Sequence, residues 1–157
     1  DGTLTAIDPV KDEVIAKYPI FGKRPNEIEV TSDGRFVYVP ALGDGVYEVF
    51  DTRQKKIVAR VPTDGYPHNV VVSPDDRYMY LSPYDRGKSP VEKVAAQGLP
   101  TSLNKKVYIV DTRTHTVTDT IATGNTPRPI VLSRDGKRLF VNTDDFMGFL
   151  VLDIPGR

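Results

Sequence analysis

Short runs of β-branched and aromatic residues recur along the chain, and polar turn residues separate them. The runs EIEV, NVVV and PIVL are typical of strands covered on both faces. RFVYVP, RYMYLS and RLFVNT each follow after a turn and alternate more strongly, and VYEVFD and VYIVD come next. KIVARV and TVTDTIA then alternate apolar and polar residues, as an edge strand half in water would. Outside one segment there is no helical periodicity, so the pattern predicts an all-β chain.

These runs belong to an internal repeat. An apolar residue followed by Asp recurs at intervals of 43, 60 and 42 residues, at Ile7-Asp8, Phe50-Asp51, Val110-Asp111 and Leu152-Asp153. The middle interval carries an insertion of about 18 residues, so the period is about 42. A second aspartate follows the first three anchors after 24 or 25 residues, in the turns TSDGR, SPDDR and SRDGK. Four short antiparallel strands per period of about 42 are the signature of a β-propeller blade.

We label the strands of a blade a to d from the axis outward. In chain order the pattern reads cd, abcd, abcd, abc, from TLTAI to FLVLD, which is about three blades. Propellers close with roughly 4 to 8 blades. We therefore expect residues 1–157 to be a partial propeller within a six- to eight-bladed ring, completed by the same polypeptide or by another chain. Its repeats cover 3–45, 46–85 and 107–148, with a final strand at 149–153 and an insertion at 86–106.

Composition narrows the classes of partner that the chain could bind. The 157 residues carry 21 basic and 21 acidic side chains, and this zero net charge argues against nucleic acid as a partner. No apolar run is long enough to cross a bilayer, and no cysteine is present for disulfides or thiolate metal sites. The chain opens on DGTLTAID without a leader, so any export signal has been removed or lies outside this sequence.

Blade topology predicts which loops share a face. Strands a and c run parallel, so the loops leading into them lie at one end of the blade, and the a–b and c–d turns lie at the other. Asn26, His68 and Arg128 occupy one equivalent position at the start of three successive a strands, so we expect them at the mouth of the central channel. The candidate ligand-binding residues on this face are Asn26, His68, Asn69, Arg128, Tyr84 and Asp85.

His68 is the natural candidate for proton transfer or metal ligation, because its unperturbed pKa lies near neutrality. Arg128 is suited to hold a carboxylate or phosphate. The alternative is that His68 is a channel-mouth residue bonded to water or to a neighbouring blade. His115, in the c–d turn DTRTHT, has no partner nearby in sequence and is expected to be exposed. The loop aspartates lack calcium-loop spacing and are interpreted as turn formers, so no metal is expected.

The insertion departs from the repeat. Ser89 to Glu92 has the form of a capping box with Pro90 at the first helical position, and Gly98 and Pro100 can end a helix. We therefore predict a short helix over Pro90 to Gln97. Such a short helix must pack on something, either as a lid or as an interface element. The candidate partner face comprises Val91, Val94 and Phe146.

The units resemble the YVTN-type β-propeller repeat, through VDTRTHTVTDTIATGNTPRPIVLSRDGKRLFV, FDTRQKKIVARVPTDGYPHNVVVSPDDRYMYL and a more divergent first copy. The resemblance covers nearly the whole chain outside the insertion. It implies similarity to surface-layer and periplasmic propellers, and hence a periplasmic or extracellular location. The repeat units are also similar to the haem-d domain of cd-type nitrite reductase. In that family, histidines in the same Pro-His segment line the ligand face.

Three hypotheses about function follow. The first is an exported, non-catalytic or accessory propeller that presents a loop face to a partner protein or small ligand, with no cofactor. The second is a propeller enzyme or cofactor domain, either a lactonase-like hydrolase or a haem-d-type oxidoreductase domain. In it, His68 acts as base or axial ligand, Arg128 holds an acid group, and haem is implied. The third is a surface-layer module. No catalytic motif decides whether the protein is an enzyme.

Overall fold

The computed structural model describes residues 2–19, 22–64, 66–84, 105–124, 126–143 and 148–154, and these residues form strands and turns without a helix. The bounds of the thirteen strands are β1 Thr3–Asp8, β2 Glu13–Pro19, β3 Glu29–Val30, β4 Phe36–Ala41, β5 Val46–Asp51, β6 Lys56–Pro62, β7 Tyr66–Val72, β8 Tyr78–Tyr84, β9 Lys106–Asp111, β10 Thr116–Ala122, β11 Ile130–Leu132, β12 Arg138–Asn142 and β13 Phe149–Asp153. The helix predicted over 90–97 lies outside the described residues.

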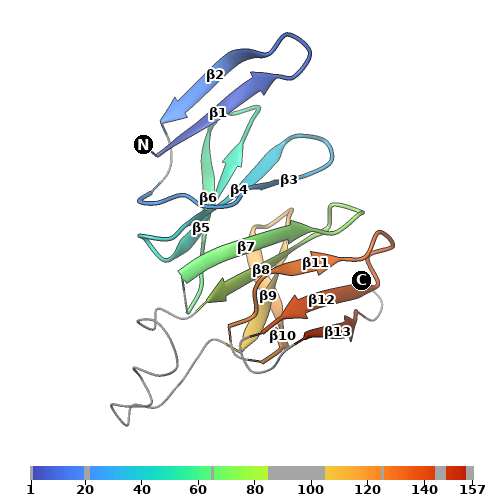
Figure 1. Cartoon of the computed structure of the whole chain (residues 1–157). Coiled ribbons are helices and arrows are strands. Elements are labelled where there is room, and N and C mark those ends of the chain that lie inside the picture. Colours follow the sequence, from blue (N-terminus) through green and yellow to red (C-terminus); the bar gives the residue numbers. More distant parts are fainter. Residues whose placement is uncertain are drawn as a thin grey trace.

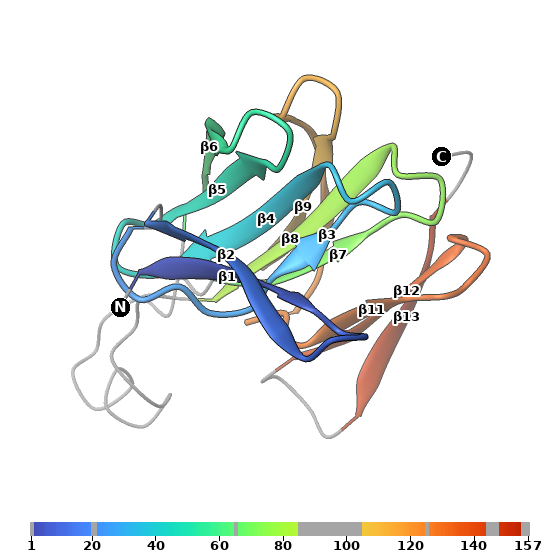
Figure 2. The ribbon, with the colours of Figure 1, turned by 90° about the horizontal axis from the view of Figure 1, so that it is seen from above.

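The strands form four antiparallel sheets that follow one another in chain order (Figure 1). Sheet 1 holds β1 and β2, sheet 2 β3 to β6, sheet 3 β7 to β10, and sheet 4 β11 to β13. Within sheets 2 and 3 every strand pairs with its chain neighbour, which is the predicted a-b-c-d order. The innermost strands lie in succession, with β7 contacting both β3 and β11 (Figure 2). The prediction of an all-β chain built from four-stranded antiparallel sheets is confirmed.

Apolar side chains from facing sheets form the core between them. Between sheets 2 and 3 the cluster is Tyr38, Tyr47, Val49, Val61, Val70, Met79, Leu81, Tyr108 and Val110. A second cluster, including Tyr80, Ile109 and Leu139, lies between sheets 3 and 4. Val37, Val39 and Phe50 of sheet 2 pack against Leu4 and Tyr18 of sheet 1. Because successive residues of a strand point to opposite faces, one strand supplies both neighbouring clusters.

Equivalent residues differ in exposure according to whether a further sheet covers them. Ile28, Val70 and Ile130 occupy one position in sheets 2, 3 and 4, and their exposed fractions are 57%, 4% and 2%. Phe149 of β13 is 61% exposed, whereas its counterpart Val107 is wholly buried. Val131 of β11 is 57% exposed as well. Ile28 and Val131 lie on the outer faces of the first and last a strands that the structure describes, which are the faces that a partial propeller leaves open.

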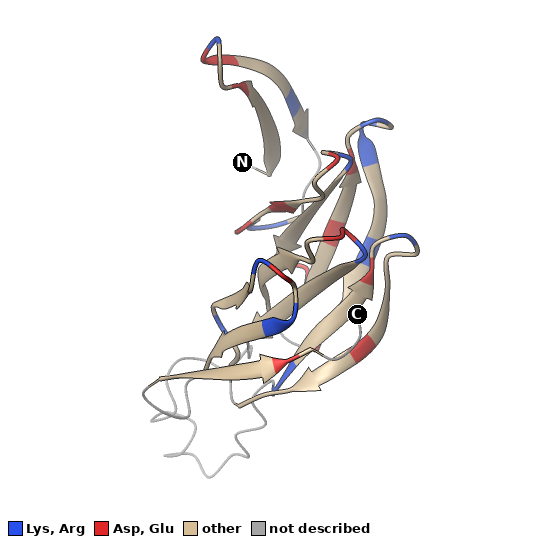
Figure 3. Cartoon of the chain, turned by 90° about the vertical axis from the view of Figure 1, so that its right-hand side faces the viewer, with Lys and Arg blue, Asp and Glu red and all other residues tan. Residues whose placement is uncertain are grey.

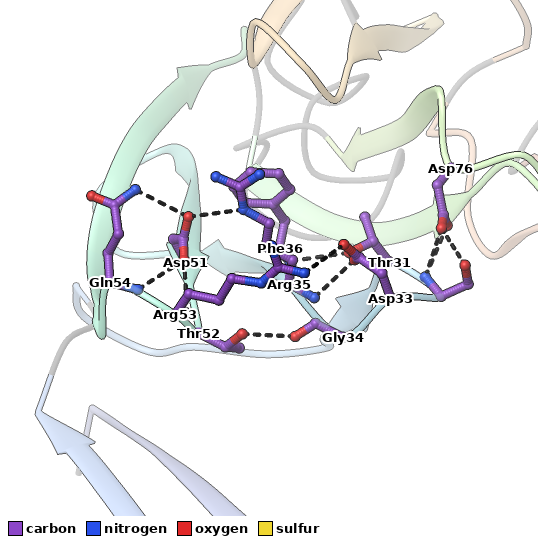
Figure 4. Close-up of polar contacts among 11 residues, drawn as sticks. Thr31, Asp33, Gly34, Arg35, Phe36, Asp51, Thr52, Arg53, Gln54 and Asp76 are labelled. Carbon is purple, nitrogen blue, oxygen red and sulfur yellow. Dashed lines mark hydrogen bonds and ion pairs between the residues drawn. The ribbon is translucent and has the colours of Figure 1, made fainter.

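The turns repeat as closely as the strands do. In each a–b turn a hydroxyl donates to the aspartate two residues on, from Thr31 to Asp33 at 2.7 Å and from Ser133 to Asp135 at 2.6 Å. In the c–d turn of sheet 2, Asp51 Oδ1 accepts the backbone N–H groups of Arg53 and Gln54 at 2.8 and 2.9 Å (Figure 4). These bonds explain why the spacing of the two aspartates repeats from blade to blade, since each carboxylate satisfies turn amides that a sheet cannot. Lys and Arg alternate with Asp and Glu over the turns (Figure 3).

Candidate functional site

The P-x-x segments that precede the inner strands lie at one end of the sheets. In sheet 2 the N–H of Asn26 donates to the carbonyl of Pro40, near the end of β4, at 3.2 Å. In sheet 4 the N–H of Arg128 donates to the carbonyl of Asn142, at the end of β12, at 2.8 Å. His68 lies near the start of β7, beside the last residues of β8. The structure thus places Asn26, His68 and Arg128 at the same end of three successive sheets.

His68 lies in a β-bulge. Tyr66 pairs with Tyr84 and Asn69 with Ser82, so that Pro67 and His68 together face the single residue between those partners. A bulge frees backbone groups from the ladder and re-aims a side chain, and bulges are over-represented beside active sites. Here the freed groups find a partner on another sheet.

The hydroxyl of Tyr47 on β5 fixes this bulge. It accepts the N–H of His68 at 2.9 Å and donates to the carbonyl of Asn69 at 3.1 Å. The Tyr47 side chain is wholly buried, and burial raises its pKa far above the ordinary value, so the hydroxyl keeps the proton that it donates. One phenol therefore holds two successive residues of the neighbouring sheet in place.

Three polar side chains converge beside the bulge: Glu27, Asn69 and His68. The amide nitrogen of Asn69 donates to Glu27 Oε2, and its oxygen lies 3.2 Å from His68 Nδ1. Glu27 Oε1 is 3.8 Å from the same ring nitrogen. Asn69 is buried, whereas the side chains of His68 and Glu27 are 24% and 44% exposed. We call these three residues the His68 cluster.

The cluster determines which nitrogen of His68 carries a proton. A carboxylate only accepts hydrogen bonds, so the amide of Asn69 must turn its nitrogen to Glu27 and its oxygen to His68. An amide oxygen also only accepts, so Nδ1 must be the protonated nitrogen of the neutral ring. Nε2 is then the acceptor, which is the form that serves as general base or metal ligand.

Not every predicted site residue joins this cluster. His68 and Asn69 contact Glu27 and Tyr47, whereas Asn26 and Arg128 are held to the strands of their own sheets by the backbone bonds above. Tyr84 ends β8 opposite Tyr66. Asp85, Val91, Val94 and Phe146 lie outside the described residues.

Sequence reasoning missed Glu27 and Tyr47. Glu27 occupies in sheet 2 the position that Asn69 occupies in sheet 3, immediately after the residues singled out from the repeat. Comparing that next position between copies would have found the pair. Tyr47 carried no such signal, because its role depends on contact between two sheets.

His115 is not the exposed turn residue that was expected. It is half-buried, and its Nδ1 lies 2.8 Å from the hydroxyl of Tyr38 on β4. Its ring also meets the edge of Phe36 at a centroid distance of 4.6 Å. Burial, with help from the charge of Arg35, lowers the pKa of His115. The prediction failed because the partners come from the preceding sheet, 77 residues away along the chain.

Two further observations concern the described part of the chain alone. No three His, Cys, Asp or Glu side chains among its residues are arranged to hold a metal ion. None of its segments forms a helix of the length and apolarity needed to span a membrane.

Comparison with known proteins defines the class. The chain superimposes on Kuenenia stuttgartiensis hydrazine synthase with a TM-score of 0.77 at 20% identity, over 97% of this chain and 40% of that one. It superimposes on the dihydro-heme d1 dehydrogenase NirN, solved in complex with DHE, with a TM-score of 0.67 at 18% identity, over 95% and 30%. A functionally unknown protein from Desulfotomaculum acetoxidans gives 0.66 at 17%, over 90% and 41%. With the four-stranded sheets, these matches show that the chain is part of a β-propeller.

One curated relative is similar in sequence. Antigen Lp49 of Leptospira interrogans serogroup Icterohaemorrhagiae serovar copenhageni (strain Fiocruz L1-130) is 33% identical over 112 residues, which are 71% of this chain and 23% of that protein. No protein-family model matches the chain. The chain thus spans less than half the length of each of these proteins.

Proposed function

We propose that this part of the propeller binds a small ligand at the end where the inner strands begin, with Arg128 holding an acid group of the ligand and His68 Nε2 accepting a hydrogen bond from a donor group on it. The observation that carries the proposal is the Asn69 amide placed between Glu27 and His68 Nδ1. It orients the imidazole and assigns Nε2 the acceptor role, and a histidine serving only as polar filler needs neither. A carboxylate within 4 Å of the histidine is also what a working base requires.

Two neighbouring features support the same proposal. Ser82 lies directly across the ladder from Asn69, and its hydroxyl is buried without a hydrogen-bond partner among the described residues. A buried hydroxyl beside a polar cluster is a group that a ligand or water satisfies. Arg128 occupies the position of His68 in the next sheet, where its guanidinium would offset the ligand's acid group.

Malate and succinate test the proposal in ¹H–¹⁵N correlation spectra of the chain, because both are dicarboxylates and malate alone carries a hydroxyl that can donate to His68 Nε2. We expect malate to shift the resonances of His68, Asn69 and Arg128, and His68→Gln with Arg128→Gln to weaken that binding at least about tenfold. His115→Gln is the matched control, since that histidine lies in a turn. Shifts that are absent, or that persist in the double variant, would overturn the proposal.

A haem-type cofactor domain is the second candidate function. A tetrapyrrole with acid side chains combines an acid group with a metal that accepts a histidine nitrogen, and NirN was solved with DHE. The residues fit on donor chemistry, because a ligating histidine ordinarily donates its other ring N–H to a carbonyl or carboxylate. His68 would hold the metal through Nε2 and Arg128 an acid side chain. The bound group would supply redox chemistry.

Haem and metal-free protoporphyrin separate the two candidates. If His68 is an axial ligand, haem binding gives a Soret shift that His68→Ala abolishes, while protoporphyrin binding is unchanged by that substitution. If haem produces no Soret shift with the wild-type chain, the cofactor candidate is wrong and the acid-ligand proposal stands or falls on the carboxylates.

The remaining parts of the proposal concern the whole protein. We propose that further blades complete a larger ring, because the exposed faces of sheet 4 and of β3 repeat positions that are buried between sheets elsewhere. We also propose that the protein acts outside the cytoplasm, as the resemblance to exported propellers implied. Phe149→Lys is expected to reduce aggregation of this chain alone and to destabilise the full-length protein. Cell fractionation tests the location.

A further inference from the structure

The turn end of sheet 3, opposite the end that carries His68, contains a cavity. Its volume is about 150 Å³, and the residues that line it are Asp76, Arg77, Asp111, Thr112 and Arg113. They come from the a–b turn and the c–d turn, which the bond from Thr112 N–H to the carbonyl of Arg77 holds together at 3.1 Å. Sheet 2 carries the same turns with nearly the same residues, so it serves as an internal reference.

In sheet 2 the protein's own side chains fill this place. Asp51 is the counterpart of Asp111, and its Oδ2 accepts Arg35 Nε at 3.2 Å and Gln54 Nε2 at 3.1 Å (Figure 4). The Asp51 side chain is entirely buried. Both oxygens of this carboxylate are therefore satisfied within the turn.

In sheet 3 neither of these donors reaches the carboxylate. Thr114 replaces Gln54, and its hydroxyl shares a hydrogen bond of 2.7 Å with Thr116. The Arg77 guanidinium lies over the ring of Tyr78, 5.4 Å from its centroid. Asp111 Oδ1 holds the turn, as in sheet 2, but Oδ2 has Arg113 Nη2 at 3.6 Å, and the side chain is 21% exposed. Asp111 Oδ2 therefore faces the cavity, whereas the equivalent oxygen of Asp51 is covered by Arg35 and Gln54.

Charge and size define what the cavity fits. Four of its five lining residues are charged, and the carboxylate of Asp76 already accepts the N–H and the hydroxyl of Ser32. Asp111 is therefore the carboxylate that can take a cationic group, and Arg77 and Arg113 supply the positive charge for an anionic one. A cavity of this volume holds a molecule of about the size of benzene. A small α-amino acid meets both conditions, since its ammonium and carboxylate groups are two bonds apart.

We propose that this cavity binds the zwitterion of a small α-amino acid. The ammonium group donates to Asp111 Oδ2, as Arg35 and Gln54 donate to Asp51, and the carboxylate is held by the guanidinium groups of Arg77 and Arg113. This site is independent of the His68 cluster, because it lies at the other end of the sheet. Failure of either proposal leaves the other intact.

Titration of the chain with glycine and L-alanine, followed in ¹H–¹⁵N spectra, tests the proposal. We expect shifts at residues 76–77 and 111–114, and binding of ethylamine and acetate at least about tenfold weaker, because each satisfies one half of the site. No shift with either amino acid would overturn the proposal. Equal binding of ethylamine and glycine would also overturn it, since the arginines would then have no part.

Two substitutions in sheet 3, and the converse substitution in sheet 2, make the test specific to this site. Asp111→Asn keeps the oxygen that holds the turn and replaces the acceptor at Oδ2 by a donor, so binding is expected to fall about tenfold or more. Thr114→Gln restores the residue found in sheet 2 and is expected to close the cavity. Gln54→Thr is expected to open a second, weaker site at Asp51. Unchanged amino-acid binding in Asp111→Asn and Thr114→Gln would contradict the proposal.

Discussion

The two histidines of this chain lie in sheet 3 at opposite ends of the blade, and their surroundings differ in kind. His115 shares a hydrogen bond between its Nδ1 and the hydroxyl of Tyr38 in the preceding sheet, and it packs against Phe36, so its ring is part of the contact between blades. His68 has its backbone held by Tyr47, and its Nδ1 faces Asn69 and Glu27. One ring stabilises the fold through the hydrogen bond that its Nδ1 shares with Tyr38. The other is oriented by its neighbours, and the assigned acceptor is Nε2.

The largest loss of stability is expected from substitution of Tyr47, the tyrosine that holds the bulge. Tyr47→Phe removes the hydroxyl that pairs with both the N–H of His68 and the buried carbonyl of Asn69, which is expected to cost about 2–3 kcal/mol of the free energy of unfolding. Urea denaturation measures the loss. Tyr108→Phe is the control, because its hydroxyl accepts one partly buried N–H, from Asp64 at 3.2 Å. Equal losses in both variants would contradict a special role for Tyr47.

A smaller loss is expected at the other histidine. His115→Lys removes the hydrogen-bond partner of the Tyr38 hydroxyl and is expected to cost about 1–2 kcal/mol of the free energy of unfolding. Lysine suits this test because Lys55 occupies the equivalent turn of sheet 2 with the same left-handed backbone, at φ 55° against 56°. A double-mutant cycle with Tyr38→Phe isolates the hydrogen bond. A coupling energy near zero would show that His115 stabilises the fold by packing alone.

The same contact predicts a pH dependence. The pKa of His115 is lowered on folding, chiefly by burial, so the unfolded chain binds its proton more readily. Stability from this group is complete above the ordinary histidine pKa and is lost progressively as pH falls below it. Asp51, with its pKa lowered to about 2 mainly by the N–H of Gln54, loses its contribution only below pH ~4, so the two effects separate. The free energy of unfolding, measured from pH 8 to pH 5, is expected to fall less steeply with pH in His115→Lys than in the wild-type chain.

The smallest effect on stability is expected at His68 itself. Its side chain is partly exposed and the bulge is held through its backbone, so His68→Ala is expected to change stability by less than about 0.5 kcal/mol. Ligand binding, by contrast, should be lost. A destabilisation as large as that of His115→Lys would mean that His68 is a structural residue.

How far the sequence predicts this molecule follows from the range of each interaction. The turns at Asp33, Asp75 and Asp135 could be predicted, because turn chemistry is local and repeats with the period. The shared end of Asn26, His68 and Arg128 followed from strand direction alone. The environment of His115 could not be predicted, since it depends on how two sheets twist against each other. Glu27 was not predicted to belong to the site, because a glutamate just before a strand is ordinarily a solvent-exposed surface residue.

The protonation state of His68 tests the proposed site most directly. Long-range ¹H–¹⁵N correlation of the neutral imidazole distinguishes its two tautomers, and the position of the Asn69 amide predicts that Nδ1 carries the proton and Nε2 does not. Asn69→Ala is expected to release the ring to the mixture found in free histidine. A wild-type ring protonated on Nε2 would contradict the proposed orientation and remove the support for His68 as the ligand-contacting residue.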